Sequence, residues 1–267
     1  MTLENSGGDN RLQRAERRAL QREDEMYLSQ ALNLGPDPRS IAAHVRHMVH
    51  LLSNPAAASP CADAMHHLGE LYSRTVPKAD LACRKGCAAC CTQLVTVTAP
   101  EALWVAAQIR RKPAMVEKLR AADTKTHGLS MDVRLKSHII CPLLEAEICS
   151  VYTARPIGCR GFVSLNLDAC LATFVRGAEP QIPTPARHTD ILYTCRMLLY
   201  AALRLRQLKD AAYELNAAVL AALAFDDAEA RWLKGEDIFA AVPITGGVPA
   251  NFETAISQLV AHVAPTV

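Results

Sequence analysis

The sequence predicts a mainly α protein: a helical bundle with an irregular central region that cysteine-bound metal organises. Three observations lead to this expectation. Apolar residues recur at helical spacing near both ends of the chain, residues 124–190 carry few periodic signals, and eight of the ten cysteines lie between Cys83 and Cys170. A long irregular stretch is uncommon in a compact domain unless something other than an apolar core orders it.

Composition limits the class of protein. The chain has 267 residues, enough for one domain or two small ones, and half of them are apolar. Lys and Arg number 29 against 27 Asp and Glu, so the basic excess of a dedicated nucleic-acid binder is missing. The first residues lack a secretory pattern, and the longest apolar run, residues 217–225, is too short to span a bilayer. We therefore expect a cytoplasmic protein without membrane or nucleic-acid partners, in a compartment that disfavours disulfides.

The N-terminal third reads as helices. Residues 1–10 are polar and are expected to be disordered, whereas residues 11–34 have a charged composition without a breaker that favours a helix. A second helix is expected after Ser40, which we predict as its cap, because apolar residues follow it at helical spacing. A third helix is expected to begin at Ser59, with Pro60 in its first turn.

The remaining elements follow the same reasoning. Residues 92–98 form the one clear β-branched segment and predict a strand. Thr98 and Glu101 form a capping-box pattern that opens a helix, and a further helix is expected over residues 113–123. Helical spacing returns from residue 189 onward. The predicted organisation is a disordered N-terminus (1–10), N-terminal helices (11–78), a cysteine-cluster metal-binding region (79–172) and a C-terminal helical region packed on it (173–267).

The first cysteine group has two possible conformations. If residues 83–91 were helical, Cys83, Cys87 and Cys90 would lie within about 60° of one another on one stripe. If the segment is a loop, Gly86 would permit the tight turn that lets thiolates converge. Either conformation gathers sulfur.

The second cysteine group adds sulfur next to two arginines. Thiolates that lie close together repel one another, and a soft cation, as zinc or in an iron–sulfur cluster, relieves that repulsion. Arg155 and Arg160 could donate to the sulfur atoms and moderate their charge, although surface ion pairs are an equal alternative. The predicted metal ligands are Cys83, Cys87, Cys90, Cys91, Cys141, Cys149, Cys159 and Cys170.

These motifs resemble a known family. CRKGCAACC at residues 83–91, CPLL at 141–144, CSVYTARPIGCRGF at 149–162 and LDAC at 167–170 resemble the YkgJ-type cysteine-cluster family, which carries a zinc- or iron-chelating domain. Many members have two residues between the first two cysteines, where this chain has three. The resemblance implies an iron–sulfur protein, and flagellin lysine N-methylases bear a similar motif.

The spacing favours an iron–sulfur cluster, most simply a 4Fe-4S cluster, over zinc. Structural zinc sites usually come as paired Cys-x₂₋₄-Cys knuckles. Cys87 and Cys90 make one such pair, but the second group has no matching pair. Zinc, mononuclear iron and metal-free thiols stay open, as does the division of eight cysteines among centres. The first group also has the C-x₃-C-x₂-C spacing of radical S-adenosylmethionine enzymes, but helices precede it where their barrel would need a strand.

Two classes of function remain. The protein is either a metal-dependent or electron-transfer module that docks a protein partner, or an enzyme that modifies a protein or peptide side chain, as the resemblance to lysine N-methylases implies. No catalytic residue can be named, because phosphate loops, dinucleotide fingerprints and hydrolase motifs are missing from the sequence.

Histidine offers a rival site. His44, His47 and His50 fan across about 120° of a helix, so two of them, with His66 or His67, could meet one ion. The simpler interpretation places them as ordinary histidines of a bundle, and Cys61 and Cys195 as core residues.

Overall fold

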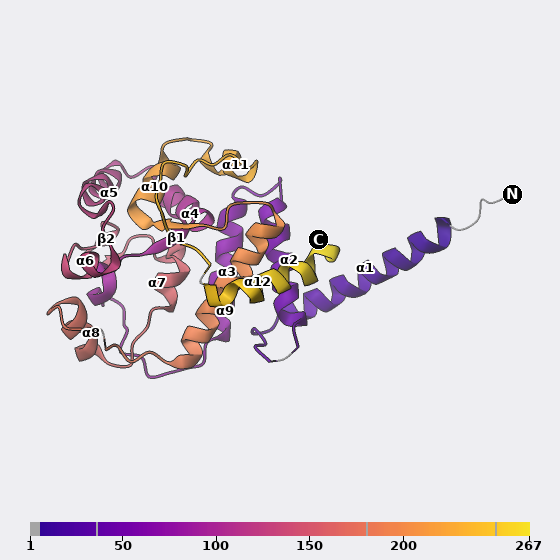
Figure 1. Cartoon of the computed structure of the whole chain (residues 1–267), viewed down its shortest axis with the longest axis horizontal. Coiled ribbons are helices and arrows are strands. Elements are labelled where there is room, and N and C mark those ends of the chain that lie inside the picture. Colours follow the sequence, from indigo (N-terminus) through magenta and orange to yellow (C-terminus); the bar gives the residue numbers. More distant parts are fainter. Residues whose placement is uncertain (1–5, 36, 180, 249) are drawn as a thin grey trace.

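The fold is mainly α, as the sequence predicts (Figure 1). The computed structural model describes residues 6–35, 37–179, 181–248 and 250–267. None of the helices in these ranges is long and apolar enough to cross a membrane.

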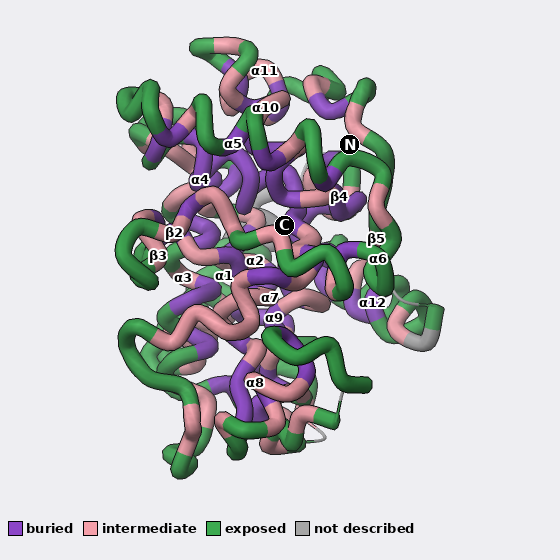
Figure 2. The backbone as a smooth tube through the Cα atoms, turned by 90° about the vertical axis from the view of Figure 1, so that its left-hand side faces the viewer, coloured by how far each residue is buried: buried purple, intermediate pink, exposed green. Residues whose placement is uncertain are grey.

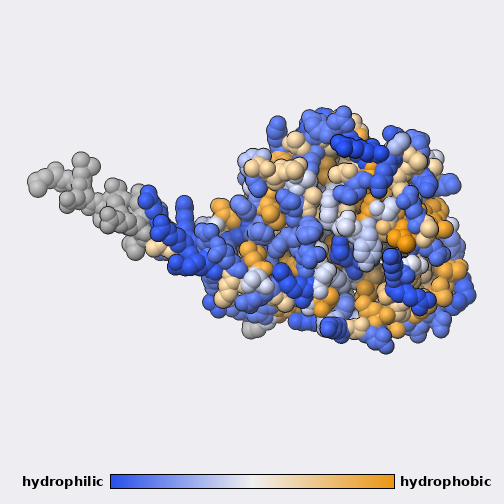
Figure 3. All heavy atoms as spheres, turned by 180° about the vertical axis from the view of Figure 1, so that it is seen from behind, coloured by the Kyte–Doolittle hydropathy of each residue, from blue (hydrophilic) through white to orange (hydrophobic). Residues whose placement is uncertain are grey.

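Helix α1 (Ser6–Leu28) projects from the rest of the molecule (Figure 1). It begins earlier than predicted, so residues 6–10 are helical, while the rest of the segment expected to be disordered, residues 1–5, lies outside the described residues. Figure 3 shows hydrophilic side chains along its described part. Its last turns are held by ion pairs from Asp24 to Arg46 and from Glu23 to Arg39.

The central bundle is built from α2 (Arg39–Ser53), α3 (Pro60–Thr75), α9 (Ala186–Leu205) and α12 (Ala250–Val263), which pack on one another. Figure 2 shows their buried backbone at the centre of the molecule. Ser59 caps α3 as predicted by accepting the N–H of Ala62. The expected cap Ser40 is wrong: α2 starts one residue earlier, and Ser40 is buried and accepts the N–H of Asn33 instead.

A second group of helices packs on this bundle. It comprises α4 (Ala99–Ile109), α5 (Pro113–Thr126), α10 (Leu215–Leu223) and α11 (Ala228–Leu233). A small antiparallel sheet lies beside them, in the order β1 (Thr96–Thr98), β4 (Ala212–Glu214) and β5 (Ile244–Gly246). The predicted strand is therefore shorter than residues 92–98, and its partners come from the C-terminal third, where only helices were expected.

The two cysteine-bearing segments flank α4 and α5 in the sequence. The first contains the 3₁₀ helix η1 (Ala89–Thr92). The second follows α6 (Met131–Lys136) and contains short elements only, joined by loops. They are β2 (Leu144–Glu145), β3 (Ile148–Cys149), the 3₁₀ helix η2 (Tyr152–Ala154), α7 (Ile157–Gly161) and α8 (Leu167–Phe174); one further 3₁₀ helix, η3 (Ala264–Thr266), ends the chain.

Candidate metal centre

The first cysteine group adopts the loop alternative rather than the helical one. Gly86 has φ +84°, in the left-handed region that glycine enters at low cost, and the chain reverses there. The N–H of Cys87 donates to the carbonyl of Arg84 at 3.0 Å, and that of Cys91 donates to Ala88 at 2.9 Å. The loop therefore turns tightly enough to hold its thiols close to one another.

Backbone hydrogen bonds bring the second cysteine segment against the first. The N–H of Cys141 donates to the carbonyl of Cys91 at 2.7 Å. At the other end, the N–H of Ala82 donates to the carbonyl of Ser164 at 2.9 Å, and α8, which carries Cys170, packs on η1. Segments about 50 to 80 residues apart in sequence thus meet, as the sequence predicts.

Neighbouring thiols in the first cysteine group raise one another's pKa values. Burial raises the pKa of Cys83, and the neighbouring sulfurs of Cys90, Cys87 and Cys170 raise it further. A hydrogen bond with the Cys91 thiol, followed by burial, raises the pKa of Cys90.

The same holds for the second group. Burial raises the pKa of Cys141 to about 11, with Cys149 adding to the shift. Burial also raises the pKa of Cys159, and Cys141, Cys90 and Cys149 contribute. All ten cysteines are free thiols, so no disulfide joins the predicted ligands.

Arg155 is half-buried near these thiols. Its Nε lies buried without a hydrogen-bond partner, while its guanidinium stacks 4.5 Å from the ring centre of Tyr152. The positive charge acts on Cys90 and Cys159, in each case lowering the thiol pKa against the larger effects that raise it. An N–H without a partner beside sulfur suits a donor that completes its bonding when thiolates form.

Arg160, predicted with Arg155 to donate to the sulfur atoms, donates to a backbone carbonyl instead. Its guanidinium donates to the carbonyl of Thr153 at 2.8 Å and lies against Gly69 on α3, where a Cβ would come within 3.2 Å of its Nε. Burial and the charge of Arg155 lower its pKa, and Cys149 is the one cysteine among its main electrostatic neighbours.

Arg134 is a residue that sequence reasoning missed. Its side chain is buried, and one guanidinium nitrogen donates at 2.6 Å to the carbonyls of both Thr92 and Ile139. These carbonyls lie next to Cys91 and two residues before Cys141, so Arg134 ties the two cysteine segments together. Its Nε is also buried without a partner, and its charge lowers the pKa of Cys141 against burial. A single Arg in a short amphipathic helix gives no sequence signal for this role.

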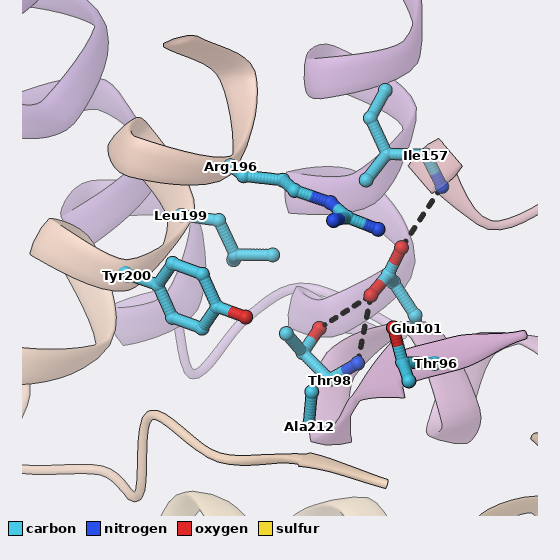
Figure 4. A pocket seen from close by; sticks show the side chains of 8 residues that line it. All are labelled: Thr96, Thr98, Glu101, Ile157, Arg196, Leu199, Tyr200 and Ala212. Carbon is cyan, nitrogen blue, oxygen red and sulfur yellow. Dashed lines mark hydrogen bonds between the residues drawn. The ribbon is translucent and has the colours of Figure 1, made fainter. Parts of the chain in front are cut away.

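A buried glutamate attaches the cysteine region to the helical scaffold (Figure 4). Glu101 completes the predicted capping box by accepting from the N–H of Thr98 at 2.7 Å. Its other oxygen accepts from the N–H of Ile157 at 2.9 Å, which fixes the start of α7 two residues before Cys159. The surrounding pocket encloses about 240 Å³, solvent at its mouth included, and Arg196 and Tyr200 reach into it from α9.

The histidines form a separate cluster. Nδ1 of His44 lies 3.2 Å from Nε2 of His67, and the ring centres of His47 and His67 are 4.5 Å apart. Burial lowers the pKa of His44 to about 4 and that of His67 to about 3. His50 stacks on His47 at the exposed end, and His66 is exposed. The two predicted core cysteines are both fully buried, Cys61 in α3 and Cys195 in α9.

The described thiols do not converge on one point. Across the described ranges, no three His, Cys, Asp or Glu side chains lie in a geometry that would hold a single ion. Ligation would therefore need rotation of cysteine side chains that sit mostly on loops and short helices. The donor set itself fits a zinc or iron group, because it offers soft thiols and two arginines, Arg134 and Arg155, whose Nε groups are buried without a partner.

Comparison with known families points to the same segment. Residues 82–174 match the CxxCxxCC family, described as "Putative zinc- or iron-chelating domain". This match confirms the resemblance that the cysteine motifs predict and supports a metal cofactor of zinc or iron. No match to the chain was found among curated proteins or among solved structures.

Proposed function

We propose that this protein holds an iron–sulfur cluster, in its simplest form a 4Fe-4S cluster, on the cysteines of residues 82–174, for electron transfer or as a metal-dependent module. One observation carries the proposal: the Nε of Arg155 is buried without a hydrogen-bond partner, and the charge of this arginine acts on the thiols of Cys90 and Cys159. A buried N–H without a hydrogen-bond partner is costly. Thiolates that form on metal binding would supply that partner.

The choice of iron–sulfur over zinc rests on how the thiols are presented. A zinc ion and an iron–sulfur cluster both carry net negative charge when four thiolates bind them. The nearby arginines therefore support either metal group. Cys90 and Cys91 are adjacent in η1, and Cys141, Cys149, Cys159 and Cys170 come from separate elements. Paired knuckles typical of structural zinc are therefore missing from the described second segment. A bound cluster would supply one-electron redox chemistry at this position.

The chain's own residues would hold and tune the group. The cysteines would bind it, Arg155 would donate to sulfur, and Arg160 would add positive charge near Cys149. Exposed apolar side chains concentrate in the same region and support docking of a protein partner. Of the eleven large apolar side chains that are exposed among the described residues, six lie there: Met131, Val133, Ile140, Ile148, Tyr152 and Leu165.

Anaerobic purification tests this proposal. We expect visible sulfide-to-iron charge-transfer absorption, with iron and acid-labile sulfide in the stoichiometry of a cluster. Stoichiometric zinc without labile sulfide would overturn the iron–sulfur proposal in favour of a zinc site. Protein that contains neither metal would overturn both. Arg155→Met should weaken retention of the group, whereas Arg120→Met, an exposed arginine on α5, should not.

The same preparation separates a module from an enzyme. A fully ligated cluster whose spectrum does not change when S-adenosylmethionine is added supports the electron-transfer or metal-dependent module. A spectral change on its addition would indicate an open iron and favour the alternative, modification of a protein or peptide side chain.

A further inference from the structure

Helix α1 is held to the rest of the molecule near one end. It packs on α2, and its ion pairs to the bundle come from Glu23 and Asp24, close to its C-terminal end. Residues 13–19 are exposed on every side of the helix, which extends into solvent (Figure 1). A helical segment of about 12 to 15 residues is marginal in water unless one of its faces is packed. The projecting half of α1 would therefore gain stability from a partner that packs along it.

The exposed part of α1 carries a heptad pattern. Ala15, Ala19, Arg22 and Met26 follow one another at spacings of four, three and four residues, the alternation of a coiled-coil seam. At 100° per residue, these positions lie within about 60° of one another. All four residues are exposed, and Met26 is 47% exposed. We call these four residues the α1 seam.

The residues of α1 that approach the bundle lie on a different side. Leu20, Asp24 and Tyr27 are half-buried, and their positions are centred roughly 140° from the α1 seam. A second helix can therefore pack on the seam without displacing the contacts that join α1 to the bundle.

Opposite charges flank the α1 seam. Arg18 lies on one flank, and Glu16 and Glu23 lie on the other. Among the described residues of its own chain, Arg18 has no ion-pair partner. Glu23 pairs with Arg39 through Oε1, but its side chain is still 32% exposed.

The flanking charges favour one orientation of two such helices. In a parallel pair, each flank faces the opposite flank of the partner helix, so Arg18 of one copy meets Glu23 of the other, twice by symmetry. The sequence repeats this pairing one heptad earlier, with Arg11 and Glu16. In an antiparallel pair, each flank would face its own kind and like charges would meet.

We propose that α1 pairs in parallel with α1 of a second copy of this chain, through the α1 seam and reciprocal ion pairs between Arg18 and Glu23. This inference is independent of the proposed metal binding. The two alanines allow close approach but bury little apolar surface, and the charge of Arg22 in the seam costs stability. The interface falls below the roughly 1,200 Å² of a standard complex, so the dimer is weak.

Sedimentation equilibrium of the anaerobically purified full-length chain tests the pairing. With reductant present and at low salt, the wild-type chain should form a dimer with a dissociation constant on the order of 100 μM. Added salt should weaken this dimer, because exposed ion pairs are screened.

The flanking arginine is tested by charge reversal. Arg18→Glu replaces two attractive contacts by two repulsive ones and should raise the dissociation constant about ten-fold or more. Adding Glu23→Arg to this variant should restore the dimer. Arg17→Glu makes the same change in charge at an exposed position about 170° from the seam, and it should alter the dissociation constant by less than about two-fold.

The seam itself is tested by a change that should strengthen the dimer. Arg22→Leu removes a charge from between the two helices and should lower the dissociation constant at least about ten-fold. Because all of these positions except Glu23 are exposed, circular dichroism should show an unchanged bundle.

The outcomes decide the pairing without reference to metal. A wild-type chain that stays monomeric up to about 1 mM overturns the pairing of copies and would leave α1 to a different protein. Equal dissociation constants for Arg17→Glu and Arg18→Glu also overturn it, since the contact would then lie elsewhere. Failure of the double reversal to restore the dimer overturns the parallel orientation. Metal content should be the same in all variants, so each of these results leaves the proposed metal binding intact.

Discussion

Helix α9 and the stretch at residues 138–150 show two ways of holding a chain in place. Nine of the twenty residues of α9 are buried, Leu198 and Leu199 among them. Of residues 138–150, which carry two predicted ligands, Leu143 alone is buried. Burial of apolar surface stabilises the first at about 25 cal/mol per Å². Residues 138–150 bury too little apolar surface for this. They depend instead on hydrogen bonds to the carbonyl of Cys91 and to the side chain of Arg134.

The hairpin within that stretch also stores strain. Ala146 has φ +47° and Glu147 has φ +62°, the two successive positive values that a two-residue type I′ turn requires. Asn-Gly is the favoured sequence for such a turn because other residues pay a steric cost there. The contrast teaches that the scaffold stabilises itself, whereas the cysteine segments are held by ties to the scaffold and, as we propose, by metal.

Metal removal should give the largest difference between the two regions. After treatment of the anaerobically purified protein with a chelator, we expect faster amide hydrogen exchange over residues 82–93 and 138–174, because metal-binding free energy is folding free energy for such segments. Exchange in α2 and α9 should hardly change. A rise spread evenly over the whole chain, measured by mass spectrometry, would contradict the contrast.

A core deletion should affect the opposite region. Leu198 is fully buried in α9, so Leu198→Ala should lower the free energy of unfolding by about 3 kcal/mol. Leu165→Ala, at a side chain that is 47% exposed in the cysteine region, should change it by less than about 0.5 kcal/mol. Urea unfolding at fixed metal content measures both, and metal stoichiometry should stay unchanged in Leu198→Ala.

Acid should weaken the scaffold through its histidines. Burial holds the pKa of His67 near 3 and that of His44 near 4, below the ordinary 6.5, with Arg74 and neighbouring imidazoles lowering them further and Asp24 opposing the shift of His44. The folded protein keeps these rings neutral, so their contribution is complete above pH 6.5 and is lost as the pH falls toward 4. We expect about 2 kcal/mol per ring between pH 7.5 and pH 5.

The matched variants are His67→Gln and His66→Gln. The first should reduce the loss of unfolding free energy between these pH values by about 2 kcal/mol, whereas the exposed His66 should leave it unchanged. Equal pH profiles for the two variants would show that the buried cluster does not control acid stability.

Arg134→Lys tests the tie between the cysteine segments. Lysine keeps the charge, but its ammonium nitrogen sits one bond closer to the backbone than the guanidinium nitrogen that donates to the carbonyls of Thr92 and Ile139, so it should not reach both. We expect metal affinity to fall about 10- to 100-fold, as is typical for residues that support metal ligands. Arg120→Lys is the surface control, and a chelator competition gives the affinities.

The smallest effect should come from the hairpin turn. Glu147→Gly removes the steric cost of a positive φ and should stabilise the metal-free protein by less than about 1 kcal/mol. Urea unfolding compares it with Glu145→Gly, in strand β2, which should be destabilising.

Local sequence signals identified much of the fold. The caps at Ser59 and at Thr98 with Glu101, and the apolar spacing of α2 and α9, depend on residues within one or two turns of one another. The same local logic failed at Ser40, which turned inward to bond Asn33, and at β4, whose residues pair with β1 from more than 110 positions away. The predicted domain boundaries and ligand set stay predictions.

The sequence by itself determined that this chain is mainly helical and that its cysteines gather in one zinc- or iron-chelating segment, because periodicity and residue type are written locally. Only the tertiary structure decided that Arg134 bridges Thr92 and Ile139, that Glu101 anchors α7, and that His44 meets His67. Those contacts join residues far apart in the chain, and their partners are selected by which buried polar groups the packed helices leave to be satisfied.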